Sequence, residues 1–288
     1  MTGPESPRLN AAIDALPPLR DVISAFGLDA DKRLGQHFLL DLNLTHRIAR
    51  SAGDLTRGTT LEVGPGPGGL TRALLSCGAA SLIAIEKDAR CVAALETLVT
   101  ASAGRLTLHN GDALAFDSSA LGPGPCRIVA NLPYNVATPL LVGWLKTIER
   151  YESLTLMFQR EVAERIAAPV GSDAYGRLSV LTGSLANAEI LFDIHPRAFT
   201  PPPKVVSTVV RITPKPTAPT IDVQALETVT AAAFGQRRKM LRASLKSLGR
   251  DPTPLLEAAR IDPTARAETI DIAGFQRLTE VWKALYRA

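Results

Sequence analysis

The sequence has few cysteines, few histidines and few aromatic residues. Its three cysteines, Cys77, Cys91 and Cys126, show no C-x-x-C spacing, which argues against disulfides or a zinc site and is typical of reduced thiols. The four histidines are scattered along the chain, so we expect no metal site built by the protein. Aromatic residues occupy only 5% of the 288 positions, so an aromatic side chain within a motif calls for a functional reason.

Long apolar runs are also missing. The longest are of strand length, well short of the roughly 20 residues that span a membrane. The first ten residues, MTGPESPRLN, contain no basic stretch followed by an apolar run, so no secretory signal is expected. We therefore expect a cytoplasmic protein with no membrane contact. With 46% hydrophobic residues and a net charge of +4, it should have a sizeable globular core.

Apolar runs and helix-compatible stretches alternate along most of the chain, as they do in β-α-β proteins. The strand-like runs are residues 60–63, 81–85, 105–108, 127–130 and 154–158. The helix-compatible stretches are residues 42–52, 69–76, 89–100, 139–149, 160–168 and 178–185. Strands buried on both faces of a parallel sheet are continuously apolar, which fits these runs. Two further runs, 189–194 and 205–212, suit an antiparallel pair at one edge of the sheet.

Composition divides the chain into four parts. Residues 1–30 are rich in Pro and Ala and form a lead-in with a short helix near 19–26. The α/β domain is expected over 31–213, and the proline-rich segment 214–222 reads as a linker. Residues 223–288 have helical periodicity and predict a small all-helical domain. No membrane-sized or repeated segment interrupts this order.

A basic stretch without any acidic residue runs from residue 228 to residue 250. Its cations are Arg237, Arg238, Lys239, Arg242, Lys246 and Arg250. Such a stretch predicts a surface that contacts nucleic-acid phosphates, and the alternative is an ordinary solvated helix face.

A glycine-rich loop follows the first strand of the α/β domain, with the sequence Gly64-Pro65-Gly66-Pro67-Gly68-Gly69. Glycines at this point allow the backbone to approach a ligand closely. Alone, the pattern is weak and would also suit a dinucleotide. Pro65 and Pro67, however, remove backbone N–H groups that a pyrophosphate would need. The loop therefore favours a cofactor without phosphates.

Acidic residues follow the next two strands. Glu86 ends the second strand, where an acid can accept hydrogen bonds from the hydroxyls of a ribose; the alternative is a surface acid that begins a helix. The third strand leads into Asp112, which can bond the amino group of an adenine ring. Three such features at successive strand ends together indicate S-adenosylmethionine as the cofactor.

The fourth strand runs into the tetrapeptide Asn131-Leu132-Pro133-Tyr134. An adenine amine is a poor nucleophile because its lone pair is delocalised into the ring. The Asn131 side chain and the Leu132 or Pro133 carbonyl can accept its N–H groups and hold the lone pair toward a methyl donor. Tyr134 offers a face on which a flipped base can stack.

A second aromatic candidate lies in the proline-rich segment that begins at Phe199. Its prolines would rigidify the loop and could present Phe199 as the other half of a stacking clamp, although a buried loop anchor is an alternative. Lys204, at the end of the same segment, could contact a phosphate.

These motifs resemble those of the ribosomal RNA adenine dimethyltransferases. The resemblance rests on Gly35-Gln36-His37-Phe38-Leu39, the Glu62–Gly66 loop, the Asn131–Tyr134 tetrapeptide and the Phe199–Val205 segment. It covers roughly residues 30 to 285, and it is greatest to the bacterial enzymes of the small-subunit (16S) RNA. It implies a Rossmann-like class I methyltransferase fold with a mostly parallel seven-stranded sheet.

The resemblance also implies an activity and a partner. The expected reaction is dimethylation of N6 of two adjacent adenosines in the 3′-terminal hairpin loop of 16S rRNA, within an immature small subunit and by a monomeric enzyme. The implied cofactor contacts are His37, Leu39, Gly64, Glu86, Asp112 and Asn131. His37 stands where the family often has Asn, and its imidazole can still donate or accept one hydrogen bond.

Two alternatives remain at the level of the sequence. One is a 23S rRNA adenine methyltransferase that confers macrolide resistance, because that group shares the fold and the tetrapeptide. The other is a ribosome-assembly factor that binds RNA and methylates it incidentally. The extended proline-rich segment and the helical domain favour the 16S enzyme over the first, and the intact site motifs argue against the second.

Overall fold

The computed structural model describes residues 7–28, 36–216 and 221–286. Gly35, which opens one of the motifs above, lies outside the described residues, as do parts of the predicted lead-in and linker.

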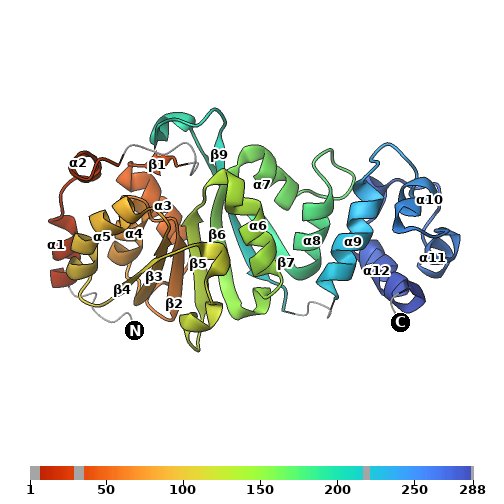
Figure 1. Cartoon of the computed structure of the whole chain (residues 1–288), viewed down its shortest axis with the longest axis horizontal. Coiled ribbons are helices and arrows are strands. Elements are labelled where there is room, and N and C mark those ends of the chain that lie inside the picture. Colours follow the sequence, from red (N-terminus) through yellow and green to blue (C-terminus); the bar gives the residue numbers. More distant parts are fainter. Residues whose placement is uncertain (1–6, 29–35, 217–220, 287–288) are drawn as a thin grey trace. The chain divides into compact units, whose positions relative to one another are not determined.

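A seven-stranded sheet forms the centre of the α/β part (Figure 1). Its strands, in spatial order, are β4 (Leu106–Asn110), β3 (Ser81–Glu86), β2 (Thr59–Val63), β5 (Cys126–Asn131), β6 (Tyr151–Gln159), β9 (Ser207–Pro214) and β7 (Ala186–Ile194). The pairs from β4 through β6 are parallel, and β9 is antiparallel to β6. The predicted class I methyltransferase sheet is confirmed, and the two predicted edge strands are neighbours.

The α-helices of this part flank the sheet, with α3, α4 and α5 grouped beside β2 to β4 and α6 beside β5 and β6 (Figure 1). They are α1 (Pro7–Asp14), α2 (Leu19–Ala25), α3 (Leu42–Ser51), α4 (Gly69–Ser76), α5 (Ala89–Ala101) and α6 (Tyr134–Leu145). Leu74 on α4, Leu82 on β3 and Val129 on β5 are fully buried in the main core. Burial on both faces explains why these strands are continuously apolar.

Helix α6 begins five residues earlier than predicted. The sequence pattern had given residues 139–149 as the helix-compatible stretch. In the structure the helix starts directly after Pro133 and carries Pro139 inside it. Tyr134 therefore lies in the first turn of α6, at the edge of the sheet, instead of in a loop.

A second, two-stranded sheet pairs segments that are far apart in the sequence. It consists of β1 (Phe38–Leu39) and β8 (Phe199–Thr200), which run antiparallel with Leu39 opposite Phe199. The pair joins two of the motifs singled out above. The sequence pattern did not predict this pairing, because a strand of two residues shows no periodicity.

Contacts divide the chain into two units. One contains Met1–Arg160 and Ile190–Thr213, and the other contains Glu161–Glu189 and Pro214–Ala288. The second unit thus includes α7 (Arg160–Ile166) from its second residue on and α8 (Arg177–Leu185), which the boundary at residue 213 had assigned to the α/β domain. The reason is packing, since α8 contacts α9 (Val223–Phe234) and α12 (Ile272–Tyr286).

The helical unit has an aromatic core of its own. Phe234 stacks on Phe275 with ring centroids 5.4 Å apart, and Tyr175 meets Phe234 edge-on. The Tyr175 hydroxyl donates a hydrogen bond of 2.9 Å to the Ile270 carbonyl. The unit is completed by α10 (Leu241–Ser244) and α11 (Thr253–Ala258). Among the described residues, 3₁₀ turns occur at Ala113–Ala115, Ser118–Leu121, Ile148–Arg150, Pro196–Ala198, Leu245–Leu248 and Ala267–Thr269.

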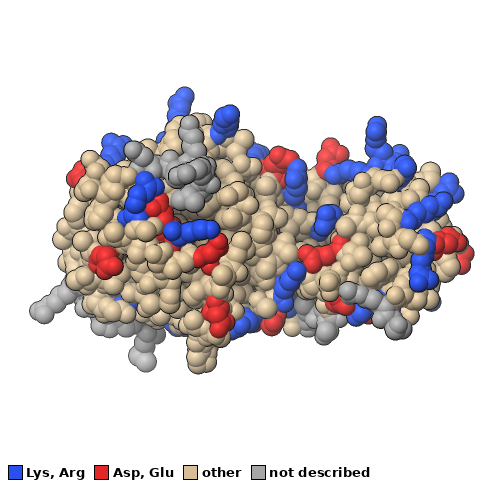
Figure 2. All heavy atoms as spheres, in the orientation of Figure 1, with Lys and Arg blue, Asp and Glu red and all other residues tan. Residues whose placement is uncertain are grey.

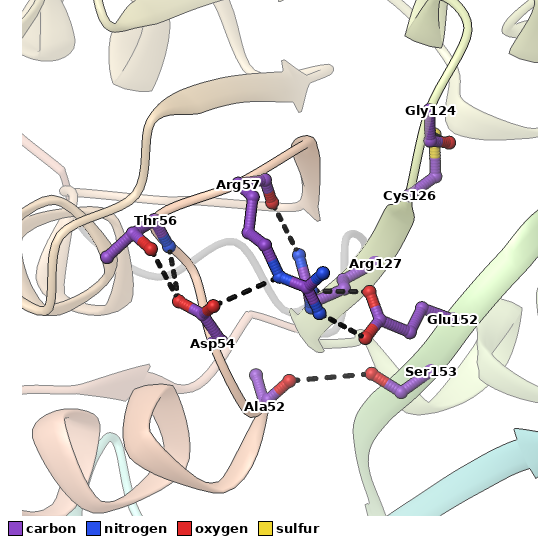
Figure 3. A network of polar contacts seen from close by, with 9 residues as sticks. All are labelled: Ala52, Asp54, Thr56, Arg57, Gly124, Cys126, Arg127, Glu152 and Ser153. Atoms are coloured by element: carbon purple, nitrogen blue, oxygen red, sulfur yellow. Dashed lines mark hydrogen bonds and ion pairs between the residues drawn. The ribbon is translucent and has the colours of Figure 1, made fainter. Parts of the chain in front are cut away.

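A buried arginine ties together the amino ends of three central strands (Figure 3). The Arg127 side chain, on β5, is only 1% exposed. It donates to the Arg57 carbonyl at 2.8 Å and pairs with the Glu152 carboxylate on β6. Arg57 also pairs with Glu152, at 3.3 Å, and with Asp54, at 3.0 Å. Because the strands are parallel, this network lies at the edge opposite the strand ends that carry the motifs.

We expect Glu152→Ala to lower the free energy of unfolding by about 2 kcal/mol, because it leaves the buried Arg127 charge without its carboxylate. The value is below that for a fully buried pair because the Glu152 side chain is 42% exposed. Urea unfolding followed by circular dichroism measures the change. Glu149→Ala, at an exposed carboxylate nearby, is the matched control and should change stability by less than about 0.5 kcal/mol. Equal losses in the two variants would contradict a structural role for the network.

Candidate functional site

A cavity of about 270 Å³ opens at the carboxyl ends of β2, β3, β4 and β5. This is the edge at which open α/β sheets bind their ligands. The cavity brings together nine residues that the sequence singled out: His37, Leu39, Gly64, Glu86, Asp112, Asn131, Leu132, Pro133 and Tyr134.

The glycine loop forms one wall of the cavity. Gly64 and Gly66 have φ angles of +70° and +55°, a region that favours glycine. A Cβ atom on Gly66 would lie 3.2 Å from the Phe38 ring, and one on Gly69 would lie 2.7 Å from the Leu39 carbonyl oxygen. The loop backbone therefore packs directly against β1. The close approach that requires glycine at positions 66 and 69 is thus an approach to β1.

Glu86 anchors the loop from the neighbouring strand. One carboxylate oxygen accepts the Gly66 N–H at 3.0 Å, and the other accepts the N–H groups of Lys87 and Asp88, both at 2.8 Å. Burial raises the pKa of this carboxyl, and the three N–H donors offset part of the rise. Glu86 lines the cavity while only 6% exposed, so its position is fixed before any ligand arrives.

Asp112 lies at the end of the cavity nearest β4. It pairs with Lys87 at 2.8 Å and accepts the Leu114 N–H at 3.0 Å, and these contacts lower its pKa. The Leu114 side chain lines the same end and is 56% exposed. An exposed leucine beside a fixed carboxylate suits a flat ring with an exocyclic amine. The sequence interpretation missed Leu114, although its place two residues after Asp112 was a usable signal.

The Asn131 amide has a defined orientation. Its Nδ2 donates to the His37 carbonyl at 3.2 Å. A carbonyl oxygen can only accept, so the atom facing it must be the amide nitrogen. The amide oxygen Oδ1 is therefore the group left to accept a hydrogen bond from a ligand in the cavity.

The His37 side chain connects three parts of the site. Its Nδ1 lies 2.8 Å from the Pro201 carbonyl, which can only accept, so Nδ1 carries the proton. In the neutral ring, Nε2 is then an acceptor. The imidazole also packs against Tyr134, with ring centroids 5.8 Å apart. His37 thus fixes Asn131 through its backbone and joins the proline-rich segment through its ring.

Tyr134 is held from the far side by a residue that sequence reasoning missed. Its hydroxyl lies 2.8 Å from Oγ of Ser207, which is fully buried at the start of β9. Burial raises the pKa of the Tyr134 hydroxyl, although the bond to Ser207 lowers it in part. The half-buried ring remains at the cavity wall, fixed at both edges.

The structure does not bring Phe199 to the cavity. Its side chain is 3% exposed and packs in the main core with Ile194 and Val209. The antiparallel pairing of β1 and β8 sets Phe199 opposite Leu39, and both side chains are buried. This corrects the prediction that Phe199 forms half of a stacking clamp in the described conformation, and it agrees with the alternative of a buried loop anchor. Lys204 is exposed and does not line the cavity.

The cations of the basic stretch all lie at the surface of the helical unit. Arg237, Arg238, Lys239, Arg242, Lys246 and Arg250 are each exposed. Figure 2 shows several Lys and Arg side chains over α10 and α11. Arg250 packs over the Tyr286 ring, at 5.2 Å from its centroid, and Arg237 donates to the Asp173 carbonyl.

Within the described residues, no group of three or more His, Cys, Asp or Glu side chains is placed to hold a metal ion. No helix in that part of the chain is long and apolar enough to cross a membrane.

Comparison with known proteins identifies similar sequences over nearly the whole chain. The family model described as ribosomal RNA adenine dimethylase matches residues 27–283. A ribosomal RNA small subunit methyltransferase A of Rhodospirillum rubrum is 60% identical over 267 residues, which cover 92% of each chain. The protein of the same name from Mesorhizobium japonicum is 60% identical over 277 residues, covering 93% of this chain and 99% of the other.

Solved structures show the same architecture. A dimethyladenosine transferase from Plasmodium falciparum superposes with a TM-score of 0.74 at 24% identity, covering 86% of this chain and 98% of the other. The 23S rRNA methyltransferase ErmE superposes with a TM-score of 0.65 at 27% identity, covering 85% of this chain and 98% of the other.

Proposed function

The chain belongs to the ribosomal RNA adenine dimethylase family, and from this we propose that it transfers methyl groups from S-adenosylmethionine to N6 of two adjacent adenosines in 16S rRNA. The target is the 3′-terminal hairpin loop, and the products are N6,N6-dimethyladenosines made during small-subunit biogenesis. The single observation that carries the proposal is the Asn131 amide, whose oxygen is oriented as an acceptor beside Tyr134 at the cavity.

S-adenosylmethionine supplies a methyl group on a positively charged sulfur, which an amine nitrogen can attack directly. Glu86 would accept the ribose hydroxyls, and Asp112 with Leu114 would hold the adenine ring. The glycine loop would cradle the remaining part of the cofactor, and His37 and Leu39 would close the cavity from β1. All of these residues line the cavity, and Glu86 is held in place there by backbone N–H groups.

The target adenine would enter beside the tetrapeptide. Asn131 Oδ1 and the Leu132 or Pro133 carbonyl would accept the two N6–H groups, which turns the nitrogen lone pair toward the methyl group. Tyr134 would stack on the base, and its bond to Ser207 keeps the ring from turning away. No strong general base is required, because the proton leaves after the nitrogen has become cationic.

The likeness to relatives favours the small-subunit RNA as substrate. The two enzymes named for the small subunit are 60% identical to this chain, whereas ErmE is 27% identical. Exposed Lys204 and the basic stretch would contact phosphates of the rRNA in an immature small subunit. We also propose that the enzyme acts as a cytoplasmic monomer.

The test uses purified protein, radiolabelled S-adenosylmethionine, and unmethylated small subunits beside unmethylated large-subunit RNA. Label would be mapped by nuclease digestion and mass spectrometry. Dimethyladenosine in the 3′-terminal 16S hairpin supports the proposal. Label in 23S rRNA would favour the resistance enzyme instead, and subunit binding without label would favour an assembly factor.

We expect neutralisation of Arg237, Arg238 and Lys239 to make RNA binding less dependent on salt. Each phosphate contact releases about 0.7 to 0.9 counterion, so the slope of log K against log salt should fall by about 2 to 3 in magnitude. Binding titrations at several salt concentrations measure the slope. A charge-preserving variant with Arg237→Lys, Arg238→Lys and Lys239→Arg should keep the slope of wild type. An unchanged slope in the neutral variant would make this stretch an ordinary solvated surface.

A further inference from the structure

A carboxylic acid that the mechanism does not use lies in the wall of the cofactor cavity. Glu62, on β2, is 1% exposed and lines the cavity directly before the glycine loop. Its Oε2 atom is buried and has no hydrogen-bond partner among the described residues. A buried charged oxygen without a partner is costly, so this carboxyl favours its neutral, protonated form.

The surroundings of Glu62 reinforce that preference. Its neighbours across β3 and β5 are Ala84 and Val129, which carry no charge. The remaining groups that act on it are the carboxylate of Glu86, on β3, and the hydroxyl of Thr71, on α4. Burial first, and then the charge of Glu86, raise the Glu62 pKa to about 8. The Thr71 hydroxyl offsets part of this rise, although its oxygen makes no hydrogen bond of good geometry.

We propose that Glu62 holds a proton in the cofactor-free enzyme and releases it to solvent when the positively charged cofactor binds. The inference rests on S-adenosylmethionine as the cofactor. Binding breaks the O–H bond of the carboxylic acid and leaves a carboxylate, whose charge is balanced by the cofactor's positive charge within the same cavity. No electron is transferred, and the only other product is the proton, which the buffer takes up.

The charges around the cavity explain why Glu62 would hold a proton and then release it. An ionised Glu62 and the Glu86 carboxylate would repel each other before the cofactor binds. Protonation of Glu62 relieves the repulsion without a resident cation. When a cationic ligand binds, Glu62 can ionise and balance its positive charge. A neutral ligand of the same shape gains nothing from this ionisation.

Isothermal titration of S-adenosylmethionine alone tests the proposal, in buffers of different ionisation enthalpy near neutral pH. With a pKa of about 8, wild-type protein should release about 0.9 proton from this group per cofactor bound at pH 7. Glu62→Gln cannot ionise and should release about one proton fewer. Glu96→Gln, at an exposed carboxylate on α5, should match wild type. Equal proton release by wild type and Glu62→Gln would overturn the proposal.

A second measurement, the pH dependence of unfolding, detects the Glu62 proton in the cofactor-free protein. Glu62 has a pKa of 4.5 in the unfolded chain and about 8 in the folded protein. Its proton therefore stabilises the folded protein fully below pH 4.5, and this stabilisation is lost as the pH rises to about 8. The unfolding equilibrium constant of wild type, relative to Glu62→Gln, should therefore rise up to tenfold per pH unit across that window. A constant ratio would overturn the proposal even if Glu62→Gln binds no cofactor. Neither measurement involves RNA, so a failed rRNA assay leaves this result interpretable.

Discussion

Replacement of Asn131 with alanine should lower kcat for adenosine methylation by about 10²- to 10³-fold, the usual effect of losing one preorganised group that acts on the reacting atoms. Asn131 Oδ1 is oriented by the bond from its Nδ2 to the His37 carbonyl, so the acceptor is in place before the base enters. Alanine removes the acceptor and leaves the N6 lone pair delocalised into the ring. Single-turnover assays with unmethylated small subunits measure the rate.

Binding of RNA should hardly change in the same variant. The amide acts on one nitrogen of one base, whereas the affinity for RNA comes mainly from phosphate contacts elsewhere. Filter binding at fixed salt measures the dissociation constant. Asn187→Ala, at an exposed asparagine on β7 outside the cavity, is the matched control and should leave both rate and affinity unchanged. Equal losses of rate and RNA affinity in Asn131→Ala would remove the amide from the chemistry.

The sequence predicted the cavity because two simple regularities act together. Buried parallel strands are continuously apolar, and the polar residue that ends each of them must lie at one edge of the sheet. Gly64, Glu86, Asp112 and Asn131 follow or end four parallel strands, of which the edge strand β4 is largely exposed, and they meet in one cavity. Nothing beyond strand order was needed to bring them together.

Other features could not be read from the sequence because they depend on which face a residue presents. The sequence allowed Phe199 to be a stacking residue or a buried anchor, and only the two-residue pairing of β1 with β8 shows that it lies in the core. Ser207 carries no motif, and only the fold brings its hydroxyl to Tyr134. Glu62 was quoted within the glycine motif, yet the lack of a partner for its Oε2 appears only in three dimensions. Segment 161–189 joined the helical unit for a similar reason, namely packing of α8.

Replacement of Glu86 should weaken cofactor binding by about 1–3 kcal/mol, which is roughly 5- to 150-fold in Kd and the range for a hydrogen bond to a charged group. Glu86→Ala removes the proposed acceptor for the ribose hydroxyls. It also leaves the N–H groups of Gly66, Lys87 and Asp88 without their partner, which loosens the glycine loop. Calorimetric titration with S-adenosylmethionine measures the loss, and Glu96→Ala on α5 should bind as wild type does.

Glutamine at position 86 should be nearly as harmful, although it has the same shape. Both carboxylate oxygens of Glu86 accept backbone N–H groups, one from Gly66 and the other from Lys87 and Asp88. An amide has only one oxygen, so either orientation turns an NH₂ group toward a backbone N–H, and two donors face each other. If Glu86→Gln bound the cofactor as tightly as wild type, Glu86 would not act as an ionised acceptor in the site. A loss in both variants, with Glu96→Ala unaffected, shows that the site needs two acceptor oxygens at the end of β3.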